Sequence, residues 1–154
     1  MKANQIFSLK TAFFMAAFLF LLLACNNDDD DPQVESKEYT IHEIGGSGIS
    51  GVALFEKTDG GTRITVELDG TSDGDTHPMH IHQNSASEGG PIAISLTAVN
   101  GATGMSVTQV TETDSGDPIT YEELIEYDGY INVHLSPTSL ATIVAQGDIG
   151  QNAP

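Results

Sequence analysis

The sequence predicts an all-β protein, an antiparallel sandwich or barrel that carries one short helix. Three observations support this prediction. Segments that alternate apolar and polar residues recur roughly every ten residues, the segments between them are rich in glycine, and only one segment has the start signal of a helix. Alternation is typical of strands with one buried face, and short strands separated by glycine-rich turns are typical of sandwiches and barrels.

The alternating segments give the positions of the expected strands. The clearest pair is 47–57 and 62–70, joined by the residues TDGG at 58–61. Asp-Gly-Gly accepts the positive φ of a tight turn, so we predict a hairpin here. The other expected strands are 38–44, 77–82, 91–99, 105–112, 130–136 and 140–150.

The expected helix covers residues 120–127. Thr120 is followed three residues later by Glu123, which is the spacing of a capping box, and Gly129 can end the last turn. The segment therefore interrupts the strand pattern with one short helix.

Residues 1–24 are expected to be a lipoprotein signal peptide. Lys2 and Lys10 precede an apolar run, residues 11–24, that is shorter than the ~20 residues needed to span a bilayer. The end of the run, Leu-Leu-Ala-Cys, resembles a bacterial lipobox, in which cleavage precedes the cysteine and the thiol is acylated. Cys25 is therefore the expected lipidation site. The alternative is a plain signal peptide or membrane anchor with an incidental cysteine.

Residues 25–37 are expected to form an acidic tether, and residues 38–154 a single β domain. Acidic residues directly after the lipidated cysteine resemble the surface-export tags of some Gram-negative lipoproteins, although a solvated spacer would have the same composition. We expect an exported protein held at a membrane by acyl chains on Cys25. This membrane would be the outer membrane of a Gram-negative bacterium, with the domain facing the periplasm or the outside.

The charge of the chain excludes nucleic acid as a partner. After Cys25 the chain keeps 3 basic residues against 22 acidic ones, a net charge of −19. Phosphate binding draws most of its affinity from lysine and arginine, and binding to anionic lipid heads does as well. The domain also has no thiol for a disulfide or for a metal ligand, because Cys25 is the only cysteine.

The histidines are the strongest functional signal, because three of the five lie in "HPMHIH". Period two places His80 and His82 on one face of their strand and places His134 on the face opposite Ile131 and Val133. We expect the apolar residues, including Met79, Ile81 and Leu135, to face the core. If the two strands are neighbours, the three histidines converge into a site suited to copper or zinc. The alternative is three imidazoles that bond to backbone or water on a half-exposed face.

The remaining candidates are weaker. His77 is either a fourth metal ligand or a loop residue, and His42 is expected to be structural or exposed. Asp73 and Asp75 are expected to shape a turn rather than bind metal. The chain has no Gly-x-Ser-x-Gly motif that would indicate a serine hydrolase.

Three segments resemble the CHRD domain, the repeat named after chordin that also occurs singly in exported bacterial proteins. They are HPMHIHQNSASEGGPIAISL (77–96), LIEYDGYINVHLS (124–136) and IVAQGDIG (143–150), the last without the arginine usual in that family. The resemblance implies an immunoglobulin-like or superoxide-dismutase-like sandwich, and it implies no settled activity.

The His-x-His strand is also similar to the copper strand of copper/zinc superoxide dismutases. That resemblance implies copper ligands at His80 and His82, with His134 on a later strand. The chain departs from those enzymes because it lacks an internal disulfide, has Arg63 as its only arginine and carries a charge that repels superoxide. We therefore expect a non-enzymatic envelope module that binds copper or zinc. The alternatives are a copper-dependent dismutase-type oxidoreductase and an interaction module with structural histidines.

Overall fold

The computed structural model describes residues 34–154, so the predicted signal peptide and Cys25 lie outside the described residues. In chain order the elements are β1 (Ser36–Glu43), β2 (Ser50–Thr58), β3 (Gly61–Asp69), β4 (Thr76–Gln83), β5 (Ile92–Asn100), β6 (Met105–Val110), α1 (Tyr121–Ile125), β7 (Asp128–His134) and β8 (Ile143–Gly150). Within residues 34–154, no helix is both long enough and apolar enough to span a membrane.

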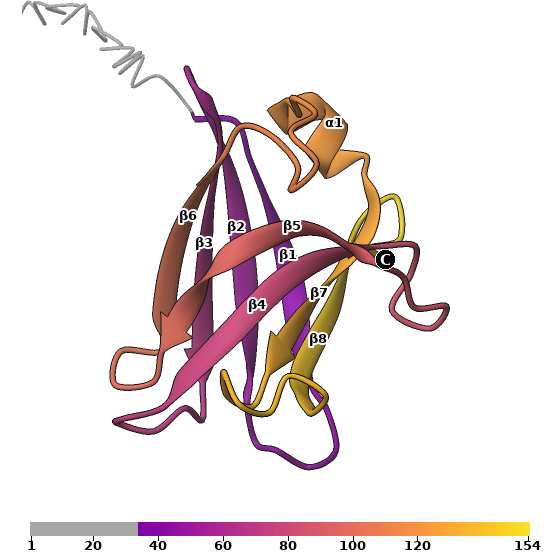
Figure 1. Cartoon of the computed structure of the whole chain (residues 1–154). Helices are drawn as coiled ribbons and strands as arrows, with labels where there is room; N and C mark the ends of the chain where they lie inside the picture. Colours follow the sequence, from indigo (N-terminus) through magenta and orange to yellow (C-terminus); the bar gives the residue numbers. More distant parts are fainter. Residues whose placement is uncertain (1–33) are drawn as a thin grey trace, which may run out of the picture. The chain divides into compact units, whose positions relative to one another are not determined.

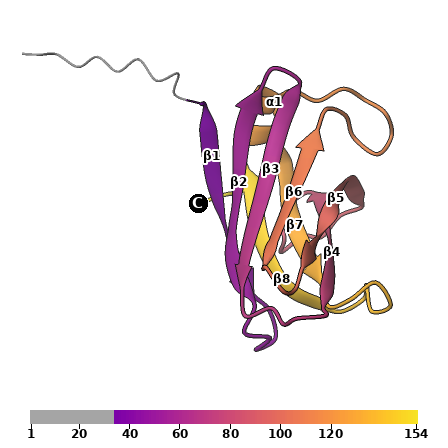
Figure 2. The same cartoon turned by 90° about the vertical axis from the view of Figure 1, so that its left-hand side faces the viewer.

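The eight strands close into an antiparallel barrel, which confirms the predicted fold class (Figure 1). The strand order around the barrel is β1-β2-β3-β6-β5-β4-β7-β8. Figure 2 shows β6 beside β3, with the β5–β4 pair beyond it. This order makes β4 and β7 neighbours although a long stretch of chain separates them, and their pairing builds the candidate site.

Alternation along the strands fills the barrel interior, as the sequence predicts. On β2 and β3 the fully buried side chains include Phe55 and Ile64, and on β4 and β7 they include Ile81 and Ile131. One hydrophobic core therefore lines the inside of the whole barrel.

The hairpin and the helix cap are confirmed. Thr58 pairs with Gly61, and Gly61 has the positive φ, 126°, that the turn requires. At the start of α1, Glu123 N donates to Thr120 Oγ1 at 3.2 Å while Thr120 N donates to Glu123 Oε2 at 2.9 Å. The helix ends at Ile125, two residues earlier than expected, and Leu124 anchors it in the core.

The strand boundaries shift by up to three residues from the prediction, and three of these shifts matter for the site or the core. β1 begins at Ser36, so Lys37 belongs to the barrel rather than to the tether. β7 ends at His134, where the pairing with β8 shifts register, and Leu135 is 44% exposed. The expectation that Leu135 faces the core was therefore wrong. Residues 135–142 form a loop instead of strand, closed by a bond from Leu135 N to Thr142 O.

Candidate metal centre

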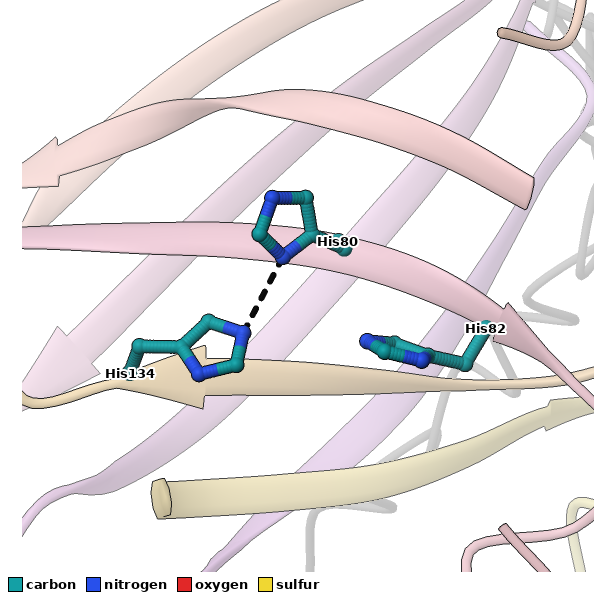
Figure 3. Close-up of side chains that lie close together, drawn as sticks. All are labelled: His80, His82 and His134. Carbon is teal, nitrogen blue, oxygen red and sulfur yellow. Dashed lines mark hydrogen bonds between the residues drawn. The ribbon is translucent and has the colours of Figure 1, made fainter. Parts of the chain in front are cut away.

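The pairing of β4 with β7 brings the three predicted histidines together. His80 lies opposite Asn132 and His82 lies opposite Tyr130, so His134 follows Asn132 on the same outer face. One ring nitrogen from each of the three histidines lies within 4.8 Å of the other two (Figure 3). We call His80, His82 and His134 the histidine trio.

Two of these rings already meet at a distance close to that of metal ligands. His80 Nδ1 and His134 Nε2 are 3.0 Å apart. Two nitrogens bound to one tetrahedral ion at ~2.0–2.1 Å lie about 3.3 Å apart. A hydrogen bond between them needs one proton, because one nitrogen must donate and the other accept. A metal ion bound between these nitrogens would take the place of that proton.

The ring of His82 is fixed by a backbone hydrogen bond on its Nδ1 side, and its Nε2 is buried. His82 Nδ1 donates to the carbonyl of Gly90 at 2.9 Å, so in the neutral ring Nε2 carries the lone pair. This Nε2 is buried and has no hydrogen-bond partner among the described residues. The ring also stacks on Tyr130 with centroids 5.1 Å apart, and Gly90 N donates to the hydroxyl of Tyr130 at 3.2 Å. A backbone carbonyl that fixes the tautomer and orientation of an imidazole is typical of metal-binding histidines.

The environment favours the uncharged form of two members of the trio, His80 and His134. Burial lowers the pKa of His80, nearby His134 and His82 lower it further, and the charge of Asp114 opposes them. Burial likewise lowers the pKa of His134, with the Leu140 backbone opposing this effect and His82 adding to it. A neutral imidazole is the form that binds metal, so both rings are in the competent state at pH 7.

The outer face around the trio is more buried than the sequence suggested. Tyr130, Asn132 and His134 are each about 95% buried, although they point away from the core. Gln146 on β8 donates to Asn132 Oδ1 at 2.8 Å, and Ala86 in the loop after β4 donates to Asp148 at 2.7 Å. The expected half-exposed face is therefore half-buried on β4, at His80 and His82, and buried on β7. We call these five residues the histidine face: His80, His82, Tyr130, Asn132 and His134.

The structure does not bring His77 to the trio. His77 is 1% exposed and shares the inward face of β4 with Met79 and Ile81. Its Nδ1 donates to the backbone carbonyl of His134 at 3.1 Å. The role of fourth ligand is therefore not supported, because the ring lies on the opposite side of the barrel wall. His77 instead holds the backbone of His134 from inside.

The other weak candidates behave as the sequence indicated. His42 is exposed on β1, and Asp73 lies exposed in the loop after β3. Asp75 takes part in the turn through its backbone, since its N–H donates to Ser72 and its carbonyl accepts from Gly101. These residues are not part of the trio.

Three supporting residues were missed by sequence reasoning: Gly90, Tyr130 in its stacking role, and Asp114. The Gly-Gly-Pro run at 89–91 was a signal for a close backbone approach, and it follows the His-x-His strand directly. Asp114 gave no signal, because it lies in an irregular loop. It accepts from Ser95 N at 2.8 Å and from Ser95 Oγ at 2.7 Å, and Ser95 is the pairing partner of His80.

The basic residues of the described segment are engaged elsewhere. Lys57 pairs with Glu35 and Glu122, Arg63 pairs with Glu56 at 3.0 Å, and Lys37 lies over the ring of Tyr39. Within residues 34–154, no ion pair or hydrogen bond joins a lysine or arginine to the trio.

Comparison of the sequence with protein-family models gave no match, and comparison with curated proteins gave none either. The functional argument therefore rests on the geometry of the trio. Three imidazole nitrogens without thiolate are a donor set that copper and zinc accept.

Proposed function

We propose that this protein is a metal-binding module that holds one copper or zinc ion through His80 Nδ1, His82 Nε2 and His134 Nε2. One observation carries the proposal: a buried, unpartnered nitrogen of His82 lies beside two imidazole nitrogens that are 3.0 Å apart. An unpaired buried polar atom is costly, and metal coordination would satisfy it. Binding needs the widest nitrogen separation to shrink by about 1–1.5 Å, given the spacing of tetrahedral ligands.

The proposal includes the setting that the sequence indicates. We propose an exported lipoprotein with a domain of the CHRD type, anchored by acyl chains on Cys25 in the outer membrane of a Gram-negative bacterium. The histidine trio lies within two of the segments on which the resemblance rests, 77–96 and 124–136. The binding role is proposed as non-enzymatic, because the basic residues of the described segment pair with groups outside the trio.

Stoichiometric metal loading tests the proposal. The purified protein is titrated with Cu(II) or Zn(II) in excess Mg²⁺, which occupies the acidic surface, and bound metal is measured by elemental analysis after desalting. We expect one ion per chain, a raised melting temperature, and loss of both in His80→Ala/His82→Ala. His42→Ala is the matched control, because it removes an exposed histidine outside the trio. Metal uptake that is absent in the wild type, or unchanged in the double variant, would overturn the proposal.

A second candidate function is a copper-dependent oxidoreductase of the dismutase type. The observation that favours it is the arrangement itself, with a His-x-His pair on β4 and a third histidine on the neighbouring strand β7. Copper would supply one-electron redox chemistry there. Superoxide turnover by the copper-loaded protein tests this candidate, and a rate no higher than that of free copper would reject it.

A further inference from the structure

His80 has a second ring nitrogen that the trio does not use. Its Nδ1 faces His134, and Figure 3 shows the other nitrogen on the far side of the ring, toward β5. When Nδ1 binds a metal ion, the ring proton must sit on Nε2. The group that receives this Nε2–H therefore decides how well His80 is oriented as a ligand.

The β5 side of His80 carries a carboxylate in a fixed place. Ser95 is the β5 residue paired with His80, and Asp114 is held over it by two hydrogen bonds, from Ser95 N at 2.8 Å and from Ser95 Oγ at 2.7 Å. The backbone of Asp114 is fixed as well, because its N–H donates to Ala93 O at 2.9 Å. Each carboxylate oxygen keeps a second lone pair after these bonds.

We propose that Asp114 is a positioning residue for the metal site, accepting the Nε2–H of His80 and so fixing the tautomer in which Nδ1 is free to bind the ion. This inference rests on the proposed function for the metal itself, while the contact between Asp114 and His80 can be tested without metal. The resulting chain runs from Ser95 through Asp114 and His80 to the ion, which is the carboxylate–histidine–metal arrangement common in metal centres.

A simpler role for Asp114 would be to close its own loop by bonding Ser95. The two roles differ in what they require. Closing the loop needs side-chain acceptors for the hydrogen bonds from Ser95, and an asparagine of the same shape keeps one such oxygen. Orienting a metal-bound imidazole needs the charge, because a carboxylate raises the basicity of the ring and offsets part of the ion's positive charge.

The test compares Asp114→Asn with Asp117→Asn. Asp117 is in the same loop, its carboxylate accepts from Ser115 Oγ at 2.9 Å, and its substitution removes the same charge. For Zn(II) measured by competition with a chelator, we expect Asp114→Asn to weaken binding by about 10–100-fold. The Asp117→Asn variant is expected to bind within about twofold of the wild type, because the Asp117 carboxylate bonds Ser115 within its own loop and not the β5 residue that pairs with His80.

A second readout is independent of metal. Long-range ¹H–¹⁵N NMR correlations report which nitrogen of His80 carries the proton in the metal-free protein. We expect the Nε2–H form in the wild type and in Asp117→Asn, and a shift toward Nδ1–H in Asp114→Asn. Ser95→Ala serves as a milder variant, since it removes one of the two bonds that hold the carboxylate and should give an intermediate loss of affinity.

The two proposals fail in different ways. Equal zinc affinities and an unchanged tautomer in Asp114→Asn and Asp117→Asn would overturn the role of Asp114 and leave the metal site intact. A wild type that takes up no metal would overturn the proposed function, and the tautomer measurement would still decide whether Asp114 bonds His80.

Discussion

The outer face of the β2–β3 hairpin and the histidine face of β4 and β7 both arise from alternation of inward and outward residues along a strand. They differ in charge and in exposure to solvent. In both, the outward residues alternate with residues of the barrel core. The outward residues of the hairpin include the ion pair of Arg63 with Glu56, whereas the histidine face contains no lysine, arginine, aspartate or glutamate. Arg63 keeps 47% of its side chain exposed, whereas His134 is 5% exposed.

The difference arises from what lies over each face. The loop at 84–91 reaches back over the histidine face, where Gly90 binds both His82 and Tyr130. The loop at 135–142 follows His134, and the Leu140 backbone acts on its ring. The hairpin has no such cover, so solvent stabilises its charges. Partial burial of this face thus favours the neutral form of His80 and His134, which is the form of imidazole that binds a metal ion.

The largest loss of stability should come from substitutions inside the barrel, where β2–β3 and β4–β7 both bury apolar side chains. Ile131→Ala on β7 and Ile64→Ala on β3 each remove a fully buried side chain and should lower the free energy of unfolding by about 2–5 kcal/mol. Urea unfolding measures both. Val107→Ala, on the exposed side of β6, should change it by less than about 0.5 kcal/mol. A small loss at Ile131 alone would contradict a continuous core.

The next effect separates the two outer faces. Asn132→Ala removes the buried acceptor of Gln146 on the histidine face and should cost about 1 kcal/mol or more, because it leaves a half-buried amide without its partner. Gln109→Ala removes a comparable amide bond to Thr58 on an exposed face, and water replaces it at a cost of about 0.5 kcal/mol or less. Equal costs in urea unfolding would show that the histidine face is not covered in solution.

Acid should weaken the histidine face before the carboxylates titrate. The pKa values of His80 and His134 are lowered in the folded protein, so below the ordinary histidine value the unfolded chain binds more protons than the folded one. Stability should therefore be full above about pH 6.5 and fall as the pH drops through the lowered folded values.

The measurement is the urea midpoint of the metal-free protein at pH 7.5 and pH 5.5. The double variant His80→Gln/His134→Gln should lose less stability over this interval than the wild type, and His42→Gln should behave like the wild type. A decline of the same size in the double variant would assign the acid sensitivity to other groups.

The smallest effect should come from the exposed ion pair. Arg63→Ala breaks the pair with Glu56 and should lower the free energy of unfolding only slightly at low salt, because solvent screens the charges. Repeating the unfolding in 1 M NaCl should remove most of the difference, since the screening length falls to about 3 Å. A cost that persists in salt would mean that Arg63 acts through packing.

Sequence reasoning succeeded where a local rule decides the outcome. Period two gave the inward and outward sides of β4 and β7 correctly, and the capping spacing of Thr120 and Glu123 gave the helix start. Alternation extended back to the start of β4 would have excluded His77 from the trio, because His77 lies two residues before Met79 and therefore points inward with Met79 and Ile81. The prediction for Leu135 was wrong because alternation applies only within a strand, and β7 ends at His134.

Non-local features could not be predicted in the same way. The closeness of His80 and His134 depends on the strand order, which alternation does not specify. The burial of Tyr130 and Asn132 depends on loops whose paths have no periodic signal. Asp114 lies in an irregular loop after β6, and only its bonds to Ser95 reveal that it sits over the β5 residue paired with His80.

The separation of His80 and His134 along the chain has a further consequence. These rings lie 54 residues apart in sequence and 3.0 Å apart in space, on neighbouring strands of the barrel wall. An ion bound between them would be a removable cross-link, closing a long loop in a described segment that contains no cysteine. Closing a loop restricts the unfolded chain, at a cost that rises by only about 0.6 kcal/mol for each doubling of its length. Loading and removing the ion would then raise and lower the stability of the barrel, as oxidation and reduction do in a protein held by a disulfide.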